Sequence, residues 1–201
     1  MKLNSKVQTK HPATQGFTLV EVMISIAVMG IGMLAVVASI ATAVAATQSA
    51  QEDLVARHKA LEALESIYTA RNSQQVAFTA INNIANGGIF QGGAQPLLCA
   101  GPDGLVGTKD DVACTTSGGV ACPNGGVECW ILPGPDGVLG TADDVTMSLS
   151  NFTRTITISQ VKLQTGAIND NMMAVSVAVS YTKDGIPKRT YTVNGLISRY
   201  N

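Results

Sequence analysis

The sequence predicts an α+β protein in which a long N-terminal helix packs on a C-terminal antiparallel sheet. The first half of this helix has the character of a membrane segment, and the second half is amphipathic. Three observations carry the prediction: an uncharged apolar run from Val22 to Ala46, a proline-free segment of helix formers after it, and strand-like alternation in residues 151–201. A loop-rich insertion, rich in Gly and containing all 4 cysteines, separates the helix from the sheet.

The composition agrees with a membrane segment joined to a more polar domain. Of the 201 residues, 46% are hydrophobic and 13% are charged, whereas about 25% of the residues in a soluble domain are usually charged. The net charge is −1, and basic residues form no stripe beyond the N-terminal segment. The sequence therefore indicates no nucleic-acid partner.

The apolar run is long enough to cross a bilayer once. A helix rises about 1.5 Å per residue, so a run from Val22 to Ala46 exceeds the hydrocarbon core of about 30 Å. Lysines precede it at positions 2, 6 and 10, and no basic residue follows it before Arg57. This asymmetry predicts a single-pass protein whose C-terminal part lies outside the cytoplasm.

The helix is expected to continue past the membrane, from about Phe17 to Ala80. Apolar residues at three- and four-residue spacing predict a stripe that faces the sheet, formed by Leu54, Leu61, Leu64, Ile67 and Tyr68. The charged residues between them are expected on the solvated sides, namely Glu52, Arg57, Lys59, Glu62 and Arg71.

An internal repeat lies in the loop-rich region. GPDGLVGTKDDV at 101–112 and GPDGVLGTADDV at 134–145 are identical at 9 of 12 positions. We name them copy one and copy two, and we expect both to be exposed hairpin loops. Each copy supplies three aspartates, which are Asp103, Asp110 and Asp111 in the first and Asp136, Asp143 and Asp144 in the second.

Two interpretations of these aspartates remain open. Carboxylate oxygens on a tight Gly-containing turn suit a hard cation, so Ca²⁺ is the candidate ligand, although the ligand ladder and the bidentate Glu of an EF-hand are absent. Alternatively, Pro-Asp-Gly is simply a turn, and the paired aspartates cap or solvate the hairpin.

The cysteines predict two disulfides formed in an oxidising compartment. Cys99, Cys114, Cys122 and Cys129 contain no C-x-x-C pair, which disfavours a zinc site, and they allow three connectivities. The repeat offset of 33 aligns Cys99 with Leu132 and Cys114 with Met147, an apolar pair that flanks copy two. If such flanks face each other, Cys99 pairs with Cys114, which leaves Cys122 to pair with Cys129.

Residues 151–201 predict three antiparallel strands. The segments NFTRTITISQVKL, NMMAVSVAVSYTK and KRTYTVNGLISRY are rich in Val, Ile, Thr and Tyr with a period of two. Val175, Val177, Val179 and Tyr181 mark one face, and Ile156 and Ile158 mark another. Three strands need a cover, which the amphipathic helix can provide.

No catalytic constellation is visible in the sequence. It contains neither G-x-S-x-G nor a phosphate-binding glycine loop, and His58 lies on the predicted helix with no nucleophile beside it. We therefore expect a non-catalytic protein.

The segment Gly16-Phe17-Thr18-Leu19-Val20-Glu21-Val22, with its short basic leader, resembles the processing motif of type IV prepilins and pseudopilins. The resemblance covers about residues 11–50. It implies that a prepilin peptidase cleaves between Gly16 and Phe17 and methylates the new N-terminus at Phe17. It also implies storage in the bacterial inner membrane, and then assembly with other pilin subunits, through the N-terminal helix, into a pilus at the cell surface.

The resemblance implies a leader (1–16) and a transmembrane and polymerisation helix (17–47). The pattern of the remaining residues predicts an amphipathic helix of the head (48–85), a loop-rich region (86–150) and a sheet (151–201). Glu21 matches the family's glutamate at the fifth mature position. Once Phe17 carries a free amine, the Glu21 carboxylate of one subunit can pair with the Phe17 amine of its neighbour. The alternative is that Glu21 lies at the membrane interface and complements the helix dipole.

Three functional classes fit the sequence. ARHKALEALESIYTARNSQQ is similar to PilV-like minor pilins, and Ala38 stands where many major pilins have a proline, so a minor pilin that joins or primes a fibre is preferred. A type II secretion pseudopilin is the second class. A single-span anchor that carries an extracytoplasmic binding domain, without processing, is the third.

Overall fold

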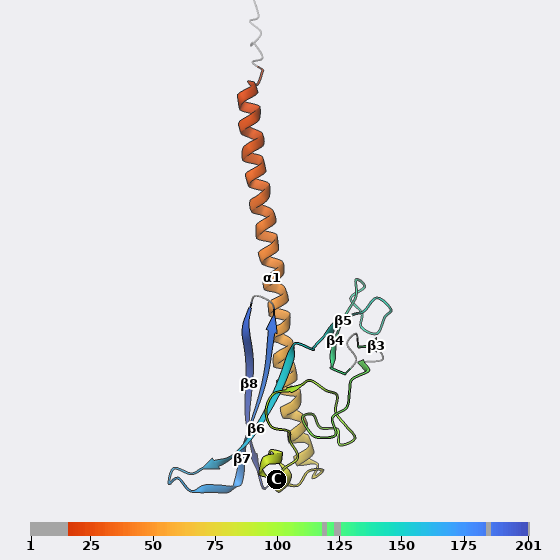
Figure 1. Ribbon diagram of the computed structural model, residues 1–201, viewed down its shortest axis with the longest axis vertical. Helices are drawn as coiled ribbons and strands as arrows, with labels where there is room; N and C mark the ends of the chain where they lie inside the picture. The colour runs from red at the N-terminus through yellow and green to blue at the C-terminus, as the bar shows by residue number, and fades with distance from the viewer. Residues whose placement is uncertain (1–15, 118–119, 123–125, 184–185, 201) are drawn as a thin grey trace, which may run out of the picture. The chain divides into compact units, whose positions relative to one another are not determined.

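A computed structural model describes residues 16–117, 120–122, 126–183 and 186–200. Apart from Gly16, the leader expected at 1–16 lies outside the described residues. The chain divides into two compact units, of which the first ends at Gln48 and the second begins at Ser49. Helix α1 (Leu19–Asn72) contributes to both (Figure 1).

In the first unit, α1 presents apolar side chains on all sides. The large ones between Leu19 and Val44 are 47–76% exposed. Among the described residues, only this helix is long and apolar enough to cross a membrane, with a mean hydropathy of 2.4 in its most apolar window and none of that window buried. Such a surface is stable only when lipid or other helices cover it.

In the second unit, half of the residues that α1 buries are alanines. The buried helix residues are Val55, Ala56, Lys59, Ala60, Ala63, Leu64, Ile67 and Ala70. The expected stripe is therefore partly wrong, because Leu54 is 57% exposed and Lys59 is only 5% exposed. The contact face therefore keeps Leu64 and Ile67 of the expected stripe and adds alanines that hydrophobicity alone does not favour.

Helix α1 ends at Asn72, earlier than the expected end near residue 80. Gln74 adopts a φ of 60°, in the left-handed region, which stops the helix. The polar run after Arg71 also removes the apolar residues that would hold another turn against the sheet. Two short 3₁₀ turns follow, η1 (Phe78–Ala80) and η2 (Ile84–Asn86).

The main sheet of the described residues has four antiparallel strands in the order β1-β6-β7-β8. Their bounds are Gln95–Pro96, Phe152–Lys162, Ile168–Lys183 and Ile186–Ser198. Ile156 lies opposite Val177 and Ile158 opposite Val175. The assignment of these residues to different faces is wrong, because directly opposed residues share a face, and all four are buried in one core.

The second half of α1 packs on this sheet, as Figure 1 shows, so the α+β fold class is the one predicted. The Tyr68 hydroxyl donates a hydrogen bond to the Leu196 carbonyl at 3.1 Å. The Tyr181 hydroxyl and Arg189 both bind the Asp53 carboxylate, at 2.6 and 2.7 Å. Desolvation, and then Asp53, raise the pKa of Tyr181.

Two small hairpins and two disulfides organise the insertion. Strand β2 (Thr116–Ser117) pairs with β3 (Val120–Ala121), and β4 (Cys129–Leu132) pairs with β5 (Val145–Ser148). The disulfides join Cys99 to Cys114 and Cys122 to Cys129, the pairing that the repeat favours. Cys99 and Val112 also form a backbone bridge, which brings the ends of copy one together.

Candidate functional site

The N-terminal segment is the first candidate site. Gly16 and Phe17 lie in non-helical backbone directly before α1, and the Phe17 side chain is 81% exposed. The Thr18 side chain accepts a hydrogen bond from the backbone N–H of Glu21 at 3.3 Å. Thr18 therefore acts as the N-cap, which fixes the start of the helix two residues after Phe17.

Glu21 lies in the first helical turn and is exposed. None of the ion pairs formed by the described residues includes Glu21. Its carboxylate complements the positive end of the helix dipole and remains free to meet a cation from outside the chain. Phe17 precedes the helix and lies four residues before Glu21 in the chain.

Residues 12–37 match a family model described as the prokaryotic N-terminal methylation motif. The matched segment contains Gly16, Phe17, Glu21 and the first part of the apolar helix. Comparisons with curated proteins and with solved structures give no match.

The motif supports a type IV pilin-like or pseudopilin-like protein, that is, a structural subunit rather than an enzyme. In general such a motif implies processing by a prepilin peptidase and assembly with other pilin subunits. One apolar N-terminal helix fits anchoring in the inner membrane before assembly. The match does not separate pilins from pseudopilins.

The duplicated loops are the second candidate site, and their aspartates bind their own backbones. In copy one, the N–H of Asp103 donates to Asp110 at 3.2 Å, and the N–H of Gly107 donates to Asp111 at 2.7 Å. The Thr108 hydroxyl also donates to Asp110, at 2.6 Å. This last hydrogen bond is the largest cause that lowers the pKa of Asp110.

Copy two repeats these three hydrogen bonds. The N–H of Asp136 donates to Asp143 at 3.3 Å, and the N–H of Gly140 donates to Asp144 at 2.7 Å. The Thr141 hydroxyl donates to Asp143 at 2.6 Å and is the main cause that lowers the pKa of that carboxyl.

The geometry favours the turn interpretation of these aspartates. Each of the six carboxylates accepts at least one hydrogen bond from a backbone N–H of its own loop. In the described part of the chain, no three acidic, His or Cys side chains converge as a metal site would require. Calcium binding stays a prediction that these contacts do not support.

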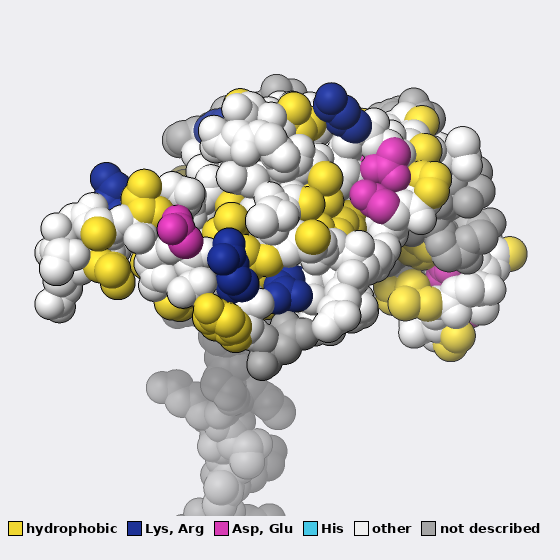
Figure 2. Space-filling view, turned by 90° about the horizontal axis from the view of Figure 1, so that it is seen from below, with side chains coloured by type: hydrophobic (Ala, Val, Ile, Leu, Met, Phe, Trp, Pro, Cys, Tyr) yellow, Lys and Arg dark blue, Asp and Glu magenta, His cyan; other side chains and the backbone are white. Residues whose placement is uncertain are grey.

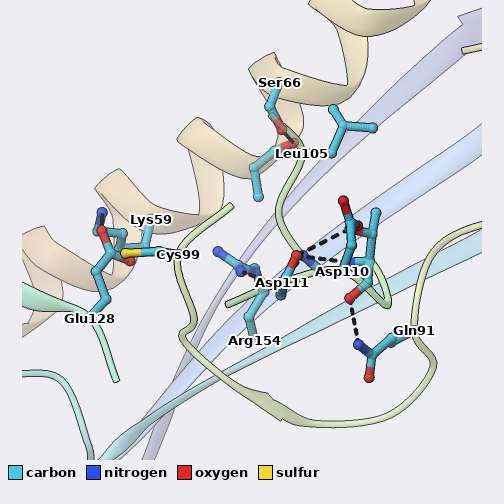
Figure 3. A network of polar contacts seen from close by, with 12 residues as sticks. Lys59, Ser66, Gln91, Cys99, Leu105, Asp110, Asp111, Glu128 and Arg154 are labelled. Carbon is cyan, nitrogen blue, oxygen red and sulfur yellow. Dashed lines mark hydrogen bonds and ion pairs between the residues drawn. The ribbon is translucent and has the colours of Figure 1, made fainter. Parts of the chain in front are cut away.

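Sequence reasoning missed two buried cations, Lys59 and Arg154, which Figure 3 shows with their acidic partners. Lys59 pairs with Glu62 at 2.8 Å and also with Glu128, and its ammonium lies 5.7 Å from the centre of the Trp130 ring. Arg154, on β6, is 2% exposed and lies 3.9 Å from Asp111. Burial lowers the pKa of Arg154, and Asp111 partly offsets that effect.

A sequence signal for both cations exists. Lys59 lies in the same helical row as Val55, Ala56 and Ala63, and Arg154 has the same strand parity as Phe152 and Ile156. Position therefore predicts an inward side chain, even though residue type predicts an exposed one.

Proposed function

We propose that this chain is a minor type IV pilin. A prepilin peptidase cleaves it between Gly16 and Phe17 and methylates Phe17, and the mature chain then joins or primes a fibre. The observation that carries the proposal is the methylation motif at residues 12–37, followed by a helix whose apolar side chains are exposed on every side.

The exposed first half of α1 supports both stages of this life cycle. Before assembly, the helix spans the inner membrane with its N-terminus in the cytoplasm, and lipid covers Leu19 to Val44. During assembly, the helices of neighbouring subunits replace the lipid. Because lipid and apolar helices solvate such side chains about equally well, extraction depends on close helix packing and on polar contacts.

Glu21 provides the polar contact in this proposal. In a bundle of helices its carboxylate is removed from water, which is costly unless a cation pairs with it. The free amine of Phe17 on an axially shifted neighbour is that cation. The pair sets the axial register between subunits, because no other axial position satisfies both charges.

The preference for a minor pilin rests on two features of the helix. Ala38 stands at the position where many major pilins carry a proline, and residues 56–75 are similar to PilV-like minor pilins. We expect deletion of the chain in the producing bacterium to reduce surface fibres and to leave secretion of folded proteins intact. Lost secretion with normal fibres would instead indicate a pseudopilin.

The register role of Glu21 is tested with Glu21→Ala and Glu21→Gln, and with Glu65→Ala as a matched control at an exposed position of the same helix. We expect both Glu21 variants to keep the two disulfides and to lose their leader. Their incorporation into sheared fibres should fall at least about tenfold, because removal of one partner leaves the other charge buried and unpaired. Normal incorporation of Glu21→Ala would return Glu21 to a helix-dipole role.

A further inference from the structure

The two copies of the repeat have the same backbone but different surroundings. Gly104 and Gly137 have φ values of 69° and 71°, and Gly107 and Gly140 have values of 84° and 91°. A Cβ on Gly101 would collide with the carbonyl oxygen of Asp110, at 2.1 Å. In copy two, a Cβ on Gly134 would collide with the carbonyl oxygen of Asp143, at 2.3 Å. With the three hydrogen bonds described above also repeated, the two loops are one structural unit used twice.

Copy one is docked into its own head, contrary to the expectation that both loops are exposed. Leu105 and Val106 are 2% and 7% exposed, and both belong to the core that also includes buried residues of α1 and the sheet. A Cβ on Gly107 would lie 2.5 Å from the Ile156 side chain of β6. We call the surface that holds copy one its seat. The base of this seat is apolar and is formed by the helix and the sheet.

Polar contacts complete this seat. The N–H of Gln91 donates to the Gly107 carbonyl at 2.7 Å, and Phe90 forms an antiparallel bridge with Thr108. Arg154 faces Asp111 from below. Copy one is thus held by an apolar groove, an extended backbone segment and a guanidinium.

Copy two has the same groups but no seat. Val138 and Leu139 occupy the positions of Leu105 and Val106, yet they are 55% and 61% exposed. A Cβ on Gly140 would meet nothing within 4 Å. Among the described residues, every hydrogen bond of residues 134–144 stays within the loop.

We propose that copy two is a docking loop for a second protein. The partner surface has the chemistry of the seat of copy one: an apolar groove that accepts Val138 and Leu139, an extended backbone segment beside Gly140, and an arginine facing Asp144. Copy two has three aspartates and no basic residue, because Ala142 replaces Lys109, so a basic rim on the partner fits its charge.

The occupant is a different protein rather than a second copy of this chain. In every copy of the chain the matching seat is already filled by its own copy one. The disulfide between Cys99 and Cys114 closes the segment that holds copy one in place, with a sequence separation of 15. An intramolecular loop with this short tether outcompetes an identical loop from outside. This inference extends the proposed function and does not depend on it.

The test places a photo-cross-linking residue at Ala142 of the full chain in the producing bacterium, and in parallel at Lys109, the equivalent exposed position of copy one. Mass spectrometry identifies the cross-linked partner and the attached peptide. We expect position 142 to give a product with a different protein, attached at an apolar segment that contains an arginine, and position 109 to give about tenfold less. Replacement of that arginine by Gln should remove the product.

A second variant separates docking from folding. Val138→Asp with Leu139→Asp, in the Ala142 probe chain, should reduce cross-linking by about tenfold or more, because carboxylates are not accepted in an apolar groove. Both positions are already exposed, so the melting temperature and both disulfides should not change. Equal products at 142 and 109, a product with this chain alone, or unchanged cross-linking in the double variant would overturn the proposal. Leader removal, measured in the same cells, reports on the proposed function separately.

Discussion

At the scale of single residues, the head depends on charges that lie inside it. Lys59 binds two carboxylates and an aromatic ring while only 5% exposed, and Arg154 meets Asp111 while only 2% exposed. Their inward position could have been predicted from periodicity, as described above. Their partners could not, because Glu128 and Asp111 come from loops whose path the sequence pattern leaves open.

We expect Lys59→Ala to lower the free energy of unfolding by about 3 kcal/mol, because it leaves Glu128 buried without its cation. The double variant Lys59→Met with Glu128→Met should recover most of this loss, since it removes both charges. Denaturant unfolding of the full chain in detergent measures both effects. Arg57→Ala, at an exposed position, is the control, and an equal small effect of all three variants would contradict a buried pair.

Thr108 and Thr141 each lower the pKa of an aspartate in their own loop. The pKa of Asp143 lies below its ordinary value of 3.8, chiefly because Thr141 donates to it. A lowered folded-state pKa gives stability that is present above 3.8 and is lost as the pH falls through the folded-state value. Thr141→Val should raise the pKa of Asp143 toward 3.8 and weaken this acid dependence.

Carbon-13 NMR titration of the aspartate carboxyls measures this change. Thr108→Val should act in the same direction on Asp110, whose pKa is lowered by the same contact in copy one. Each variant should leave the aspartate of the other loop unchanged, which makes the two copies controls for one another. An Asp143 pKa that does not move in Thr141→Val would show that this hydrogen bond is not formed in solution.

At the scale of elements, the helix and the long strands follow from sequence pattern, whereas their contact face does not. Period-two alternation located β6, β7 and β8 correctly, because one side of each strand must be apolar. The helical stripe was partly wrong because hydrophobicity favours Leu54 over Ala60. The face buried against the core instead includes Ala56, Ala60 and Ala63.

Overpacking tests this alanine face. Ala60 lies on α1 and is fully buried against the core, whereas Ala50 is exposed on the same helix. Ala60→Leu should destabilise the head by about 1–3 kcal/mol, because the added methylenes force the helix away from the sheet. Ala50→Leu should change stability by less than about 0.5 kcal/mol. Thermal or denaturant unfolding compares them, and equal effects would argue against close packing at Ala60.

The repeat shows a further limit of sequence pattern at the scale of elements. Nine identical positions in twelve predict one loop structure, and the two loops do share it. Whether each loop is buried depends on residues elsewhere, such as Ile156 and Gln91, that line a seat for copy one. The sequence identity of the two loops therefore predicted their shared conformation. It gave no information on whether a loop packs against the rest of the head.

At the scale of the whole molecule, the two units have different surface chemistry. The first unit exposes apolar side chains along its whole length. The second unit has its own core and two disulfides, and its surface mixes charged, polar and apolar side chains. On the face of the second unit shown in Figure 2, basic and acidic side chains occur in separate small groups among polar and apolar ones, with no extended patch of one sign. This contrast fits an anchor and a head with separate tasks.

In the proposed life cycle, cleavage before Phe17 creates the functional N-terminus. Mass spectrometry of the chain isolated from its producing bacterium measures this cleavage. We expect a mature protein that begins at Phe17, carries one methyl group on its α-amine and contains no peptide from residues 1–16. A mature protein that retains Met1 and the intact Gly16–Phe17 bond would contradict it.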